Sequence, residues 1–219
     1  MNKFPTILTK ELDPKKRFCY NGKSLDFSIV DFWKWNQSDL IENRNRGILA
    51  EYLTKQALGI ESSTRLEWDS FDFKTKENVK IEVKSAAFIQ AWEQTKLSSI
   101  RFDIAPKRTL LKDNNYSEKK IRNSDLYIFC LLHHKVQSTI NPMDLSQWTF
   151  YLILTEEINQ TCKNQLSVGI STLERLKHIK TDFIGIKQSY VKAISTMPNR
   201  SVYVIGAPHR ENLLAKEDR

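Results

Sequence analysis

The stretch NVKIEVKSAAF, residues 78–88, decides how the rest of the chain is interpreted. Its valines and isoleucine alternate with charged residues, which is the period of two typical of a β-strand with one apolar face. The other face carries Glu82 and Lys84, an acid and a base two residues apart. A solvated strand face with a salt bridge is the simpler interpretation of this pair, and a metal site with a lysine beside it is the alternative.

The segment before this strand indicates which acid would stand beside Glu82. RLEWDSFDF, residues 65–73, also alternates, and the polar turn KTKEN, residues 74–78, joins the two segments, so the pattern predicts a β-hairpin. If the two phenylalanines of the first strand face the core, Asp72 turns outward beside Glu82. Asp69 has the opposite parity and would need a β-bulge to join them, so it is the reserve candidate.

Two carboxylates facing each other across a hairpin repel unless a cation neutralises them. Mg²⁺ suits such a pair because it takes oxygen ligands, needs only one or two carboxylates and keeps several waters. A bound metal makes water easier to deprotonate, and Lys84 would orient that water or stabilise charge on a phosphate. Asp72 and Glu82 are therefore the expected metal ligands, the Val83 carbonyl is a further candidate, and phosphodiester hydrolysis is the chemistry that these groups fit.

These residues resemble the motif of the PD-(D/E)xK nuclease superfamily, in which an aspartate and a short turn precede Glu82-Val83-Lys84. The superfamily usually carries an acid on the helix before the hairpin, and Glu51, within NRGILAEYLTKQALG, stands at that place. Roughly residues 30–105 are similar to a bacterial family within this superfamily. One position departs from the motif, since Phe71 rather than proline precedes the aspartate.

The resemblance implies a restriction-endonuclease-like fold and a Mg²⁺-dependent nuclease, with Mn²⁺ able to substitute, acting on DNA in restriction, repair or phage defence. It implies catalytic roles for Glu51, Asp72, Glu82 and Lys84, with Glu51 supporting the metal or its water. An inactive nucleic-acid-binding or assembly subunit of the same fold is the alternative. A third reading is an α/β protein whose hairpin charges are structural.

The net charge of the chain favours a polyanionic binding partner. The sequence has 34 Lys and Arg against 26 Asp and Glu, which gives a net charge of +8. Two arginines open the helix that carries Glu51, and others lie in the basic loop 106–123. A serine follows Lys84, and relatives of the RecB-like nucleases place a glutamine on the helix that is expected after this lysine. The candidate nucleic-acid-binding residues are Arg44, Arg46, Ser85, Gln90, Lys107 and Arg108.

The order of elements predicts an α/β fold, a mixed β-sheet with helices on both faces, in a single domain. Two apolar runs, LYIFCLL and WTFYLILT, are expected to be central strands buried on both faces. Helices are expected over 38–59, ending at Gly59, and over 86–97. An irregular N-terminal arm is expected over 1–24 and the domain over 25–219, with its catalytic core at about 38–155. FSIVDFWKW, residues 27–35, is expected to form a short helix or turn packed on the domain.

Several classes of protein are disfavoured. Three widely spaced cysteines without a CxxC pair argue against a disulfide framework and a structural zinc site. The N-terminus has no signal-peptide pattern and the longest apolar run is too short to cross a bilayer, so a cytoplasmic protein without a membrane partner is expected. Phosphate-loop, nucleophile-elbow and dinucleotide motifs are lacking from the sequence. A homodimer or a partner subunit is left open.

Overall fold

The computed structural model describes residues 9–61, 64–65, 70–108 and 115–197, together with residues 4 and 7. Two expectations from the sequence lie outside these residues. One is the reserve acid Asp69 with the part of the first hairpin strand around it. The other is the middle of the basic loop, residues 109–114.

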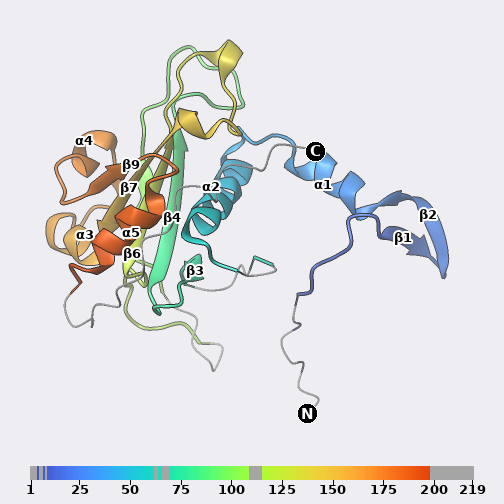
Figure 1. Ribbon diagram of the computed structural model, residues 1–219, viewed down its shortest axis with the longest axis horizontal. Helices are drawn as coiled ribbons and strands as arrows, with labels where there is room; N and C mark the ends of the chain where they lie inside the picture. Colours follow the sequence, from blue (N-terminus) through green and yellow to red (C-terminus); the bar gives the residue numbers. More distant parts are fainter. Residues whose placement is uncertain are drawn as a thin grey trace.

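The described chain contains both strands and helices, and four strands follow one another between α2 (Asn43–Leu58) and the first 3-10 turn (Figure 1). The β-strands are β1 Arg17–Tyr20, β2 Lys23–Ser28, β3 Phe73–Lys74, β4 Lys80–Ala87, β5 Phe102–Asp103, β6 Leu126–Leu132, β7 Trp148–Leu154, β8 Ser167–Val168 and β9 Ile179–Thr181. The helices are α1 Ile29–Gln37, α2 Asn43–Leu58, α3 Thr155–Thr161, α4 Ile170–Leu173 and α5 Ile186–Ile194, with short 3-10 turns η1 Gln137–Thr139 and η2 Leu145–Gln147.

A five-stranded mixed sheet forms the centre of the molecule, in the order β3-β4-β6-β7-β9. β4 and β6 run parallel, with Ile81 opposite Leu126, whereas the other neighbours are antiparallel. Parallel neighbours need a crossover connection, and the chain between β4 and β6 supplies it. It includes β5, which pairs with β8 in a separate two-stranded sheet.

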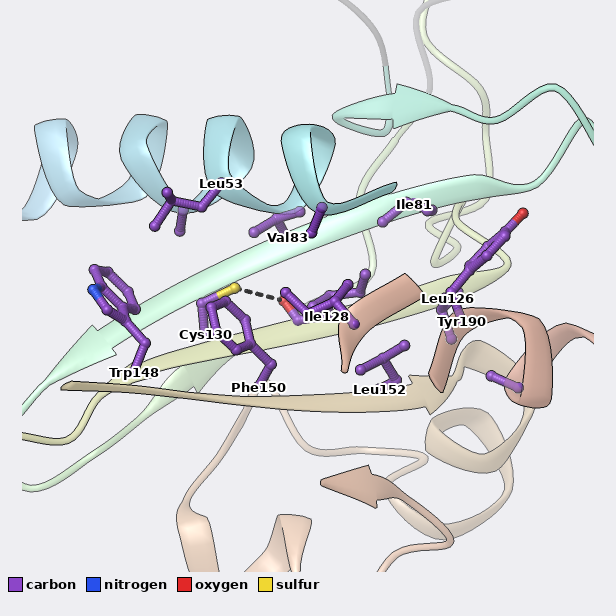
Figure 2. Packing of buried hydrophobic residues seen from close by; sticks show 14 of the residues in the cluster. Leu53, Ile81, Val83, Leu126, Ile128, Cys130, Trp148, Phe150, Leu152 and Tyr190 are labelled. Carbon is purple, nitrogen blue, oxygen red and sulfur yellow. Dashed lines mark hydrogen bonds between the residues drawn. The ribbon is translucent and has the colours of Figure 1, made fainter. Parts of the chain in front are cut away.

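Helices cover both faces of this sheet, which confirms the α/β fold expected from the sequence. On one face, α2 and α5 enclose a core in which Leu53, Val83, Ile128, Phe150 and Tyr190 meet from five elements (Figure 2). On the other face, a second core gathers side chains from β5, β6, β7, α3 and α4. Successive residues of β6 point to opposite cores, so the whole strand is buried, as its unbroken apolar run predicted.

Helix α2 places the N-terminal half of the site. Its first turn is capped by the Glu42 carboxylate, which accepts the main-chain N–H groups of Arg44 and Asn45. The helix therefore begins at Asn43, five residues after the expected start, and it continues through Gly47 without a break. It ends as predicted at Gly59, whose φ of 66° is the left-handed conformation that glycine adopts without strain.

The helix expected over 86–97 is wrong. Ala86 and Ala87 continue β4 and pair with β6, and the residues that follow form an irregular segment. Within it the Gln90 side chain donates to the Ala87 carbonyl, and the Gln94 side chain accepts from the Gln90 main-chain N–H and donates to the Phe88 carbonyl. These side chains satisfy main-chain groups that a helix would otherwise use, and strand pairing overrides the local helix propensity.

The N-terminal segment is more ordered than expected. β1 lies within the arm that was expected to be irregular, and the boundary placed at residue 25 falls inside β2. The two strands are joined at Asn21 and Gly22, both with positive φ, as two-residue hairpin turns require. Helix α1 forms where a short helix was expected. The prediction that it packs on the domain is wrong as regards burial, since none of its residues is buried, although its Asn36 carbonyl accepts a hydrogen bond from the Asn45 side chain of α2. Figure 1 shows the hairpin and α1 extending away from the five-stranded sheet.

Candidate active site

The site lies where β3 stops pairing with β4. β3 is two residues long and pairs with Lys80 and Ile81. One residue earlier, the Asp72 main-chain N–H still donates to the Ile81 carbonyl, and the Asp72 carboxylate accepts the main-chain N–H of Val83. The carboxylate thus occupies the place that a carbonyl of a longer β3 would take. This anchors Asp72 next to Glu82, the arrangement that hairpin parity predicted.

A cleft of about 380 Å³ opens at this strand edge. The structure brings the four candidate catalytic residues together in it, along with Ser85 and Lys107 from the candidate nucleic-acid-binding set. Its lining comes from α2, from the segment before β3, from β4 and from the loop after β5, and consists of Gly47, Glu51, Arg65, Ser70, Asp72, Glu82, Val83, Lys84, Ser85 and Lys107.

Glu82 is a buried carboxylate held by two lysines. Its side chain is 8% exposed, and its Oε1 accepts from Lys84 Nζ at 2.5 Å and from Lys107 Nζ at 3.2 Å. A carboxylate removed from water is strongly unfavourable unless positive charge compensates it. Lys107 thus contacts an acid of the cleft, although the sequence suggested it only as part of a phosphate track.

Asp72 carries the largest electrostatic perturbation in the cleft. Burial raises its pKa from 3.8 to about 7, and the negative charges of Glu82 and Glu51 act in the same direction. The hydrogen bond from Val83 and the charge of Lys84 offset only part of this increase. A carboxyl with such a pKa is one for which a bound cation would be strongly favourable, because the cation stabilises the ionised form.

Lys84 remains a cation in this setting. Burial alone would lower its pKa, but the Glu82 carboxylate, by charge and by hydrogen bond, and then Asp72 outweigh burial, so the pKa of Lys84 is raised. The lysine therefore supplies a fixed positive charge next to the two acids.

Glu51 faces the cleft from α2 and is held by a residue that sequence reasoning missed. Arg65 binds its carboxylate through two hydrogen bonds, Nε to Oε2 at 2.5 Å and a terminal nitrogen to Oε1 at 2.9 Å. Such two-point pairs fix the carboxylate orientation as well as its charge. Fourteen residues separate the partners, and no local pattern in the sequence signals their contact.

A buried polar cluster supports the far end of β4. Arg46 is 3% exposed, and its guanidinium donates to Ser85 Oγ, Gln90 Oε1, Asn43 Oδ1 and the Ile41 carbonyl. Burial lowers the pKa of Arg46 to about 10, so it stays charged at neutral pH. Because these partners belong to the protein itself, Arg46 fixes the position of Ser85, the residue next to Lys84.

Replacing Arg46 with alanine is expected to lower the free energy of unfolding by about 2 kcal/mol, since buried acceptors lose a charged donor. Arg44→Ala is the matched control, because Arg44 is exposed two residues earlier on the same helix, and it should change stability by less than about 0.5 kcal/mol. Urea unfolding followed by circular dichroism measures both. Equal effects in the two variants would show that the cluster does not hold β4 to α2.

The remaining candidates for nucleic-acid binding do not line the cleft. Arg44 and Arg108 are exposed, and Asp69 is outside the described residues. The Val83 N–H points toward Asp72, and in a β-strand the carbonyl of the same residue points the same way. The Val83 carbonyl therefore faces the edge of the cleft.

The donor set fits a hard cation held by few protein ligands. In the part of the chain that the structure describes, no three carboxylate, histidine or cysteine side chains converge on one point. Asp72 and Glu82 are nevertheless close enough for each charge to oppose the other, and Mg²⁺ needs only one or two carboxylates. Their oxygen chemistry also suits Mg²⁺ better than a soft metal.

The sheet and cleft together define an α/β protein with paired carboxylates and a lysine at an open strand edge. The chain belongs to the bacteriophage T4 endonuclease IV family, whose model matches residues 4–170 and so includes every residue that lines the cleft. This membership makes the chain a nuclease by family. No curated protein is similar enough in sequence to be matched. No helix in the described ranges is long and apolar enough to span a membrane.

Proposed function

We propose that this chain is a Mg²⁺-dependent endonuclease of the PD-(D/E)xK type that hydrolyses DNA. The observation that carries the proposal is the convergence of Glu51, Asp72, Glu82 and Lys84 in one cleft of a chain from an endonuclease family. DNA is the proposed substrate because the chain carries a net charge of +8, and exposed Arg44 and Arg108 add basic side chains outside the cleft.

Asp72 and Glu82 would hold the metal, the Val83 carbonyl would add an oxygen, and Glu51 would contact the ion or its water shell. When bound, Mg²⁺ supplies Lewis acidity, which eases deprotonation of the attacking water and offsets charge on the phosphate.

Lys84 would act separately from the residues that hold the metal. Its ammonium group binds Glu82. A cation held by Glu82 would neutralise part of the charge of this carboxylate. The ammonium group of Lys84 could then turn to the attacking water and to the phosphate oxygens. There it would stabilise the negative charge that develops as the phosphorus becomes five-coordinate. Ser85, fixed by Arg46, would donate a hydrogen bond to a neighbouring phosphate.

The wild-type chain is expected to cut at least one of single-stranded, linear duplex or supercoiled DNA in the presence of Mg²⁺ or Mn²⁺, and excess EDTA should stop the reaction. Gel electrophoresis of end-labelled substrate measures cleavage, and calorimetry measures metal binding in parallel. A protein that binds the metal yet cuts no DNA or RNA substrate would contradict the enzymatic proposal and favour the inactive binding subunit.

A further inference from the structure

The hairpin β1–β2 and helix α1, residues 17–37, form a folded unit that we call the aromatic arm. Its parts are tied to one another, since the Ile29 main-chain N–H donates to the Lys16 carbonyl, and Asp31 accepts from both the main chain and the hydroxyl of Ser28. Within the described residues, the extensive contacts of these three elements are with each other. The arm is thus ordered locally without packing on the sheet.

This unit exposes an unusual amount of aromatic surface. Two ring pairs, Phe18 with Phe27 and Phe32 with Trp35, lie on the hairpin and on the helix. The exposed fractions of its six large aromatic residues run from 36% to 82%, and these residues are Phe18, Tyr20, Phe27, Phe32, Trp33 and Trp35. Such a density of exposed apolar side chains marks an interaction surface.

Stability also argues that something covers the arm. An isolated helix as short as α1 is marginal in water, and so is an isolated two-stranded hairpin. Burial of the aromatic side chains against a partner would supply the missing free energy.

The charge of the arm and the geometry of its two strands indicate which partner would cover its aromatic surface. The arm carries three basic and two acidic residues, so it is nearly neutral although the whole chain has a net charge of +8. A polyanion would select for a basic surface, whereas two copies of a basic chain approach each other most easily through a neutral one. β1 and β2 make up a sheet of only two strands in the described chain, so each has an open edge, and identical antiparallel edges can pair about a two-fold axis.

We propose that the aromatic arm is a homodimerisation element, which packs against the arm of a second copy of this chain. None of the residues that line the cleft belongs to the arm, so dimerisation through the arm is separate from metal binding. The two proposals can therefore fail independently.

Sedimentation equilibrium of the full chain tests whether the aromatic arm forms a homodimer. The wild type should have twice the chain mass of 25.7 kDa. In the double variant Phe32→Ser/Trp35→Ser, dimer affinity should fall by roughly 100-fold, because truncating aromatic anchors at an interface costs this much or more. The matched control Trp92→Ser/Tyr116→Ser removes two exposed aromatics outside the arm and should remain dimeric. Calorimetric Mg²⁺ binding should be unchanged in both variants.

Cys19 provides a second, direct measurement. It is exposed on β1, while Cys130 and Cys162 are buried, so a thiol-reactive spin label should modify Cys19 alone. Pulsed electron spin resonance should give one defined distance between two labels in the wild type and none in the arm variant. A monomeric wild type, or an arm variant that stays dimeric, would overturn the proposal. An arm variant that instead loses DNA or vesicle binding from a monomeric state would assign the arm to those partners.

Discussion

In Lys84→Ala, the rate of DNA cleavage in Mg²⁺ is expected to fall by about a thousandfold. Positioned proton-transfer groups and fixed charges at the reacting phosphate each contribute effects of this order. Lys84 lies on β4 and interacts with both Asp72 and Glu82, and its raised pKa keeps it charged. Lys107 also reaches Glu82, but it comes from a loop and is far more exposed, so it replaces Lys84 poorly.

The same variant should keep or strengthen Mg²⁺ binding, because removing a cation next to Glu82 leaves more negative charge for the metal. Lys80→Ala is the matched control, since Lys80 lies on the same strand and the same side, outside the cleft lining. Single-turnover cleavage rates and calorimetry on the three proteins measure both properties. A Lys84→Ala variant that cuts DNA within about tenfold of the wild-type rate would exclude the catalytic role of this lysine.

Asp72→Asn is expected to stabilise the metal-free protein at pH 8 by about 2 to 4 kcal/mol and to abolish its stabilisation by Mg²⁺. The pKa of Asp72 is about 7 in the folded chain, against 3.8 for the ordinary side chain. The folded state therefore holds the proton more tightly than the unfolded state. Its contribution to stability is complete below pH 3.8, is lost as pH rises toward 7 and is absent above that pH. Asparagine does not ionise and avoids this loss.

Thermal unfolding in EDTA at pH 4 and pH 8 tests the prediction. The two proteins should unfold together at pH 4, and the variant should unfold at the higher temperature at pH 8. Asp182→Asn is the control, because Asp182 is exposed and its carboxylate also accepts a main-chain N–H, from Gly185. Mg²⁺ should raise the unfolding temperature of the wild type and this control but not of Asp72→Asn. Equal pH dependence in all three proteins would contradict the buried carboxylate pair.

Much of the core sheet could be predicted from patterns within short stretches of the sequence. β6 and β7 are unbroken apolar runs, and such runs occur where a strand is covered on both faces. The alternation in β4 placed Glu82 and Lys84 on one side, and parity across the turn placed Asp72 beside them. Gly59 marked the end of α2 because few other residues accept a positive φ.

The failures share one cause, which is that tertiary contacts outweighed local propensity. Ala86 and Ala87 favour a helix by composition, but pairing with Leu131 and Leu132 of β6 keeps them in the sheet. The aromatic residues of α1 favour burial, yet none of the residues of this helix is buried. The pairing of Glu51 with Arg65 joins residues that only the fold brings together.

The sequence by itself determined which residues form the strands of the core and which side of β4 carries the acid and the lysine, because side-chain alternation is a property of the extended backbone. Only the tertiary structure decided that Glu51, Asp72, Glu82 and Lys84 share one cleft, with a buried carboxylate pair that raises the pKa of Asp72. The perturbation depends on burial and on charges from separate elements, and both exist only after α2 has packed on the sheet and β3 has stopped two residues into its pairing with β4.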